Sequence, residues 1–117
     1  MKLGVLTVPL QNIPAEEAFA YLSGLGVQAL ELGTGGYTCA CHLDVEGCLA
    51  DDNKVAQVKA LLEKYRLEIA ALSCHGNPVH PDKDKAAEYH RVDVNTCKLG
   101  HLRLARGLLR NPGMAVE

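Results

Sequence analysis

The stretch that decides the fold is VQALELGTGG, which occupies residues 27–36. Its first six residues form a short apolar run that only Glu31 and one glutamine interrupt, and this predicts a buried strand over residues 27–32. Two similar runs flank it, LGVLTV at residues 3–8 and LEIAAL at residues 67–72. Three such runs at wide intervals are typical of a parallel sheet, because parallel strands are buried on both faces.

The gaps between these runs contain predicted helices. The first helix begins at Pro14, because proline favours the first helical turn. The second begins after the N-cap candidates at residues 51–53, and the third begins at Asp82 or Asp84. The order strand, helix, strand, helix, strand, helix predicts an α/β fold of repeated βα units with a parallel sheet and right-handed crossovers.

Length and composition bound the class of protein. The 117 residues amount to a single domain, and 48% hydrophobic with 22% charged residues is a globular composition. No run approaches the roughly 20 apolar residues of a membrane span, and the N-terminus lacks the features of a signal peptide. Five cysteines without an export signal predict reduced thiols and a cytoplasmic location.

Charge changes along the chain. Residues 1–91 hold 8 basic and 12 acidic side chains, a net charge of −4, whereas residues 92–117 hold 4 and 2, a net charge of +2. The overall charge of −2 argues against a nucleic-acid or anionic-membrane partner. The βα pattern also ends near Gly100, so residues 100–117 are interpreted as an atypical C-terminal segment. This segment is either a terminal helix outside the βα repeat, including Leu108, or the product of a truncated or frame-shifted gene.

Candidate functional residues gather where the predicted strands end. Ligands of βα folds bind at the carboxyl ends of the strands. Glu31 interrupts one apolar strand there, and His75 follows another, with Gly76 allowing a sharp turn. The imidazole of His75 can bind a divalent metal, orient a hydroxyl group or move a proton, or its ring can simply bind a backbone carbonyl. Glu31 either hydrogen-bonds a polar ligand or meets solvent.

Two further patterns leave alternatives open. The glycine-rich residues 33–36 offer backbone amides to a phosphate, but they lack the spacing of a dinucleotide fingerprint and the lysine of a phosphate loop. Cys39, Cys41, His42 and Cys48 suggest zinc, yet adjacent side chains are poorly placed to bind one ion together. Loop thiols without a metal are therefore the prediction, and His42 alone stays a candidate ligand-binding residue.

Three stretches together resemble a known family. They are KLGV at residues 2–5, GVQALELGTGGY at 26–37 and ALSCHGNPVHP at 71–81, and they are similar to the sugar phosphate isomerase/epimerase family. This is the xylose isomerase-like TIM barrel group, which also includes endonuclease IV. The resemblance covers residues 1 to about 90 and implies the first three βα units of a (β/α)8 barrel. It further implies a divalent metal ion (Mn, Co, Mg or Zn) and a sugar or sugar phosphate substrate.

The same resemblance implies roles for particular residues. Glu31, His42, His75 and Asn77 would contact substrate, and His75 would also be a metal ligand. A barrel needs about 250 residues, so this chain would be an amino-terminal part that lacks the catalytic base and is inactive alone. Its uncovered inner sheet face and open edges predict self-association. The alternative architecture is flavodoxin-like, with both faces of a three-stranded sheet covered.

Two other functions remain as alternatives. The first is an endonuclease IV-like zinc enzyme that acts on abasic DNA, which the acidic balance of residues 1–91 disfavours. The second is a small α/β module without catalytic activity.

Overall fold

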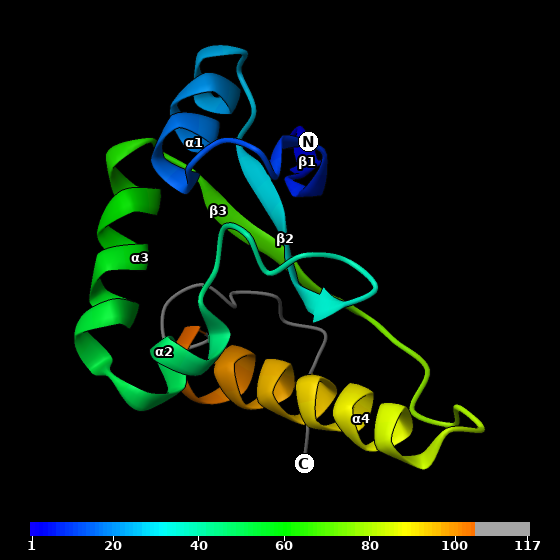
Figure 1. Cartoon of the computed structure of the whole chain (residues 1–117). Coiled ribbons are helices and arrows are strands. Elements are labelled where there is room, and N and C mark those ends of the chain that lie inside the picture. The colour runs from blue at the N-terminus through cyan, green and yellow to red at the C-terminus, as the bar shows by residue number, and fades with distance from the viewer. Residues whose placement is uncertain (105–117) are drawn as a thin grey trace.

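A computed structural model describes residues 1–104, apart from the side chains at positions 102 and 103. Its elements are β1 (Gly4–Leu6), the 3-10 turn η1 (Val8–Leu10), α1 (Ala15–Gly24), β2 (Ala29–Gly36), α2 (Val45–Ala50), α3 (Asp52–Lys64), β3 (Glu68–His75), α4 (Lys83–Lys98) and the π-helical turn η2 (Leu99–Leu104). The strands form a parallel sheet in the order β1-β2-β3 (Figure 1). The predicted α/β class with repeated βα units is confirmed.

Two aspartates start the helices where the sequence predicts them. The side chain of Asp51 accepts a hydrogen bond from the amide of Asn53 at 2.8 Å. The side chain of Asp82 accepts from the amides of Asp84 and Lys85 at 3.0 and 3.3 Å. Each carboxylate satisfies amides that have no partner inside their own helix, which is why α3 and α4 begin directly after these residues.

The central strand is longer than the sequence predicts. Residues 33–36 continue β2 and pair with residues 73–75 of β3, with an irregularity in register between Gly33 and Gly35. Glycine suits this stretch, because a Cβ on Gly33 would come within 2.6 Å of the Cys39 carbonyl oxygen and Gly36 has a φ of +85°. The backbone that was a candidate phosphate cradle is therefore part of the sheet.

One face of the sheet carries the hydrophobic core. Leu30 and Leu32 of β2 are fully buried and belong to one cluster with Phe19 of α1 and Leu62 of α3. Farther along the same face, Thr34 is hydrogen-bonded to Thr96 of α4, with 2.8 Å between the two hydroxyl oxygens. Helices α1, α3 and α4 therefore cover the same face; in Figure 1, α3 runs down one side of the strands and α4 lies along the bottom of the view.

The other face is much more open. Side chains alternate along a strand, so Glu31 points away from the face that holds Leu30 and Leu32. Glu31 is partly buried, and Ala71, its partner on β3, is exposed. A flavodoxin-like fold would have helices on both faces. The packing of α1, α3 and α4 on a single face differs from that alternative.

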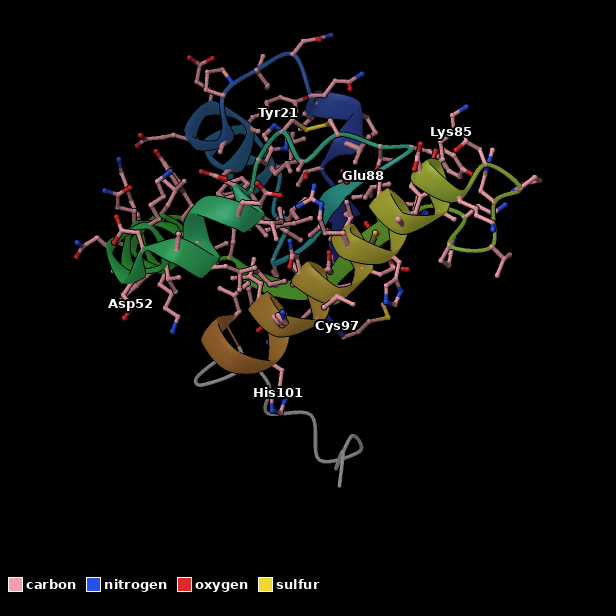
Figure 2. All side chains as sticks on the ribbon, turned by 60° about the horizontal axis from the view of Figure 1, so that its bottom comes forward. Tyr21, Asp52, Lys85, Glu88, Cys97 and His101 are labelled. Atoms are coloured by element: carbon pink, nitrogen blue, oxygen red, sulfur yellow. A yellow bond between two sulfur atoms is a disulfide. The ribbon has the colours of Figure 1, made fainter. Side chains whose placement is uncertain are left out.

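Helix α4 is solvated along its outer side. Figure 2 shows Lys85, Glu88 and Cys97 spaced along it, and all three are exposed. After α4 the chain turns through η2, where Leu99 and Leu104 are buried in the core. The part of the predicted terminal helix that includes Leu108 lies outside the described residues. Among the helices of residues 1–104, none is both long and apolar enough to cross a bilayer.

Candidate functional site at the carboxyl ends of the strands

Glu31 lies on the open face of the central strand, beside the end of β1. Its backbone carbonyl accepts a hydrogen bond from the amide of Thr7 at 3.0 Å. Glu31 is level with Ala71 on β3, four residues before His75. At about 3.3 Å per residue, Glu31 and His75 stand roughly 13 Å apart along the sheet. A ligand that contacts both side chains must extend along the strands.

His75 is the last residue of β3, and its side chain is exposed. The preceding residue, Cys74, faces α4, where burial and the Asp93 carboxylate raise the pKa of its thiol to about 11. Alternation along the strand therefore places His75 on the open face, as it does Glu31. Within the part of the chain that the structure describes, the His75 ring has no hydrogen bond or ion pair. It is available to a ligand.

Two tyrosines that sequence reasoning missed lie beside His75. Tyr37 directly follows β2, and its backbone amide donates a hydrogen bond to the carbonyl of His75. Its ring is 66% exposed and meets the ring of Tyr89 on α4 edge to face, with 5.1 Å between centroids. Tyr37 ends the stretch of residues 26–37 that carries the family resemblance, but no local pattern links it with Tyr89, because sheet pairing and the packing of α4 bring the two together. The two rings add an aromatic surface to the strand ends, on the side of α4.

Asn77 shapes the loop that leaves β3. Its side-chain oxygen accepts a hydrogen bond from the backbone amide of Val79 at 3.1 Å, which holds a tight turn after the strand. The residue is partly buried and lies two positions beyond His75. Its side-chain nitrogen remains a donor for a ligand at the same end of the sheet.

His42 is placed differently from the other predicted ligand-binding residues. It is only 6% exposed, and its Nε2 atom lies 3.1 Å from the carbonyl oxygen of Ile13. Its Nδ1 atom lies 3.8 Å from the sulfur of Cys41, and its ring meets Phe19 edge to face. Both ring nitrogens contact protein atoms, as buried polar groups generally do. The structure does not bring this ring to the end of β3 with His75.

The side chains at the strand ends do not by themselves form a binding site for a divalent metal ion. Within residues 1–104, no group of three or more His, Cys, Asp or Glu side chains is placed to hold one ion. A catalytic metal site generally uses about three protein ligands, and His75 would supply one of them.

The prediction that Cys39 and Cys41 are reduced loop thiols is wrong. The two residues are joined in a disulfide, and the turn between them brings their Cα atoms to 5.1 Å.

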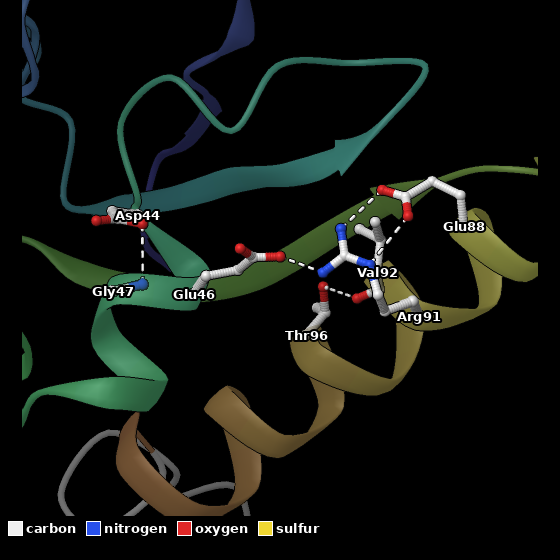
Figure 3. A network of polar contacts seen from close by, with 7 residues as sticks. All are labelled: Asp44, Glu46, Gly47, Glu88, Arg91, Val92 and Thr96. Carbon is white, nitrogen blue, oxygen red and sulfur yellow. Dashed lines mark hydrogen bonds and ion pairs between the residues drawn. The ribbon is translucent and has the colours of Figure 1, made fainter.

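A separate cavity of about 390 Å³ lies between α2 and α4. It is lined by Thr34, Ala40, Asp44, Val45, Glu46, Arg91, Val92 and Asn95. Figure 3 shows the guanidinium of Arg91 between two carboxylates, Glu88 at 2.7 Å and Glu46. These contacts raise the pKa of Arg91 and lower that of Glu88. Because Arg91 is already neutralised, the lining residues of this cavity do not favour a phosphate.

Comparison with known proteins identifies a relative of this chain, but the relative's description names no activity. No family model matches the chain. The chain is 36% identical over 81 residues to a protein of Bacillus subtilis (strain 168) described as uncharacterized protein YfiH. The match covers 69% of this chain and 26% of that protein, so the chain spans about a quarter of the length of the curated relative it matches. That description states no reaction, and the sugar chemistry stays a prediction.

Proposed function

We propose that this chain is the amino-terminal part of a metal-dependent sugar or sugar phosphate isomerase/epimerase, the first three units of a (β/α)8 barrel. Three parallel strands in sequential order, with helices packed on one face, are consistent with such a part. The relative from Bacillus subtilis is about four times as long as the matched region, which is enough for further βα units. In this reaction class a proton moves between carbons next to a carbonyl group, while a metal ion polarises the sugar oxygens.

The single observation that carries the proposal is the backbone pairing that brings two exposed residues, Tyr37 and His75, to the shared end of β2 and β3. A sugar presents C–H groups that pack on an aromatic ring and hydroxyl groups that need hydrogen-bond partners. Tyr37, whose ring meets Tyr89 of α4, supplies an aromatic ring at this strand end, and His75 and Asn77 supply polar groups at the same end. Glu31, on the same open face, would contact the far end of an extended substrate. His42 is left out of this set because its ring is buried.

The described residues would bind and orient the substrate without completing the catalytic apparatus. His75 would contribute one metal ligand at most, and the remaining ligands and the carboxylate base would come from strands beyond the third. We therefore expect no turnover by the isolated chain. Within residues 1–104, no further strand pairs with the outer edges of β1 and β3. These edges and the open sheet face would instead promote self-association.

Binding can be tested by recording amide spectra of the ¹⁵N-labelled chain during titration with D-fructose and with D-fructose 6-phosphate. We expect shifts confined to residues 35–37 and 73–77, because one hexose is too short to reach Glu31 as well. His75→Ala should abolish these shifts, and His90→Ala is the matched control because His90 is an exposed histidine on α4. Shifts elsewhere, or none with either sugar, would contradict the proposal and favour a non-catalytic α/β module.

Activity is tested separately by assaying isomerisation and epimerisation of ketoses and their phosphates with added Mn²⁺ or Co²⁺. No turnover is expected from the chain alone. Turnover that disappears in His75→Ala would show that self-association supplies the missing part of the site. Light scattering on the same samples reports the oligomeric state.

A further inference from the structure

The segment Cys39-Ala40-Cys41 forms a small cross-linked loop directly after the central strand. The disulfide joins residues separated by one position, with a Cα–Cα distance of 5.1 Å that lies within the usual range for disulfides. Cys41 is exposed, and Cys39 is partly buried. A small molecule in solution can therefore reach the sulfur of Cys41 more easily than that of Cys39.

His42 is positioned to accept a proton from the Cys41 thiol when the disulfide is open. The carbonyl of Ile13 can only accept a hydrogen bond, so Nε2 of His42, 3.1 Å away, carries the hydrogen. The lone pair is then on Nδ1, which lies 3.8 Å from the sulfur of Cys41. A base beside a thiol favours the thiolate, which is the nucleophile in disulfide exchange.

The same loop crosses the open face of the sheet. The carbonyl oxygen of Cys39 lies so close to Gly33 that a Cβ there would come within 2.6 Å of it. The hydroxyl of Thr38 donates a hydrogen bond to the carbonyl of Gly35 at 3.4 Å. The cysteine pair therefore belongs to a segment that contacts β2 beyond Glu31, at the end where the candidate site lies.

We propose that Cys39 and Cys41 form a dithiol–disulfide redox site that exchanges with a low-molecular-weight disulfide such as glutathione disulfide. Closing the site fixes residues 37–42 over β2. In the first step the Cys41 thiolate, its proton taken by His42, attacks one sulfur of the small disulfide and forms a mixed disulfide. The first small thiolate leaves and takes the proton back. Cys39 then attacks the Cys41 sulfur as a thiolate, the protein disulfide closes, and the second small thiol leaves with the Cys39 proton.

Two electrons pass from the protein to the small disulfide, whose two halves leave as thiols. The other cysteines lack this arrangement. Cys48 is 1% exposed, and burial raises the pKa of its thiol. Cys74 has a raised thiol pKa of about 11. Cys97 is exposed and free, so it can form a mixed disulfide with a small thiol without closing a ring.

The chemistry can be tested on the full chain carrying Cys97→Ser, in glutathione buffers of graded oxidation, with differential alkylation and mass spectrometry. We expect Cys39 and Cys41 to oxidise together, with no glutathione adduct accumulating. Cys39→Ser removes the resolving thiol and should trap glutathione on Cys41. His42→Asn should slow the exchange by about a hundredfold, as expected for loss of a positioned proton acceptor. Circular dichroism checks that the His42→Asn variant folds. The result with Cys39→Ser tests the proposal even if His42→Asn fails to fold.

Failure of the pair to oxidise at any glutathione ratio would overturn the redox assignment, as would a persistent adduct on Cys41 while Cys39 is intact. The effect on the loop is tested by hydrogen exchange. Amides of residues 37–42 should exchange more slowly in the oxidised form, whereas amides of α3 should not change. If residues 37–42 exchange at the same rate in the oxidised and reduced forms, the disulfide does not fix this loop over β2. Neither measurement involves a sugar, so the outcome is separate from that of the function proposed above.

Discussion

The two faces of the three-stranded sheet differ sharply in what they hold. One carries Leu30 and Leu32, both fully buried under the helices, and the other carries Glu31 and exposed Ala71. Successive residues of one strand thus serve different purposes. The helix-covered face holds the chain together, and the open face presents polar groups and the loop with the cysteine pair. Variants on the two faces should therefore affect different properties.

The largest effect is expected from the core of the covered face. Phe19→Ala removes a side chain that is 1% exposed in α1 and should lower the free energy of unfolding by about 3–5 kcal/mol. Tyr21→Ala, in the same helix (labelled in Figure 2), changes a side chain that is 56% exposed and should have an effect below about 0.5 kcal/mol. Urea unfolding followed by circular dichroism measures both. Equal losses would mean that the α1 face nearest the sheet does not carry the core.

A second difference concerns thiol reactivity on the covered face. Burial and Asp93 raise the pKa of Cys74 from 9.0 to about 11, which lowers its thiolate fraction about a hundredfold near pH 8. Iodoacetamide should therefore modify exposed Cys97 well before Cys74. The folded state holds the Cys74 proton more tightly than the unfolded state, so this contribution to stability is complete below pH 9.0 and declines toward pH 11. Equal alkylation rates near pH 8 would contradict this placement of Cys74.

A smaller effect is expected at the start of α4, the helix that covers the end of β2. Asp82→Ala removes a carboxylate that accepts hydrogen bonds from two backbone amides. The variant should lose about 1 kcal/mol of stability, the usual loss for a helix N-cap. Lys83→Ala changes the neighbouring exposed residue without removing the cap and serves as the control. Thermal unfolding of both variants measures the two losses of stability. Equal losses would contradict the role of Asp82 as the N-cap of α4.

The smallest effect on stability is expected on the open face. Ala71→Lys adds a charge at an exposed position of β3 and should change the free energy of unfolding by less than about 0.5 kcal/mol. It should nevertheless lower the average mass in light scattering, because charges on open sheet surfaces hinder association. Ala87→Lys adds the same charge on exposed α4. If both variants lower the mass equally, net charge and not the sheet face controls self-association.

Local sequence signals predicted much of the fold. The alternation of strands and helices, and the helix starts after Asp51 and Asp82, depend on apolar patterning and on hydrogen bonds within a few residues. These interactions act between neighbours along the chain, so they can be seen without the fold. His75 was singled out in the same way, because a histidine that ends an apolar strand stands out in the sequence. The structure places it, exposed, at the end of β3, and its role toward a ligand stays a prediction.

Tertiary structure decided what depends on residues far apart in the chain. Residues 33–36 extend β2 because β3 supplies backbone partners for them, and no local pattern predicts that pairing. His42 is buried because Ile13 and Phe19 meet its ring from outside its own loop. Tyr37 reaches Tyr89 only after the sheet and α4 have packed together. Short-range patterning determined which elements form, whereas long-range pairing and burial determined which side chains are left to meet a ligand.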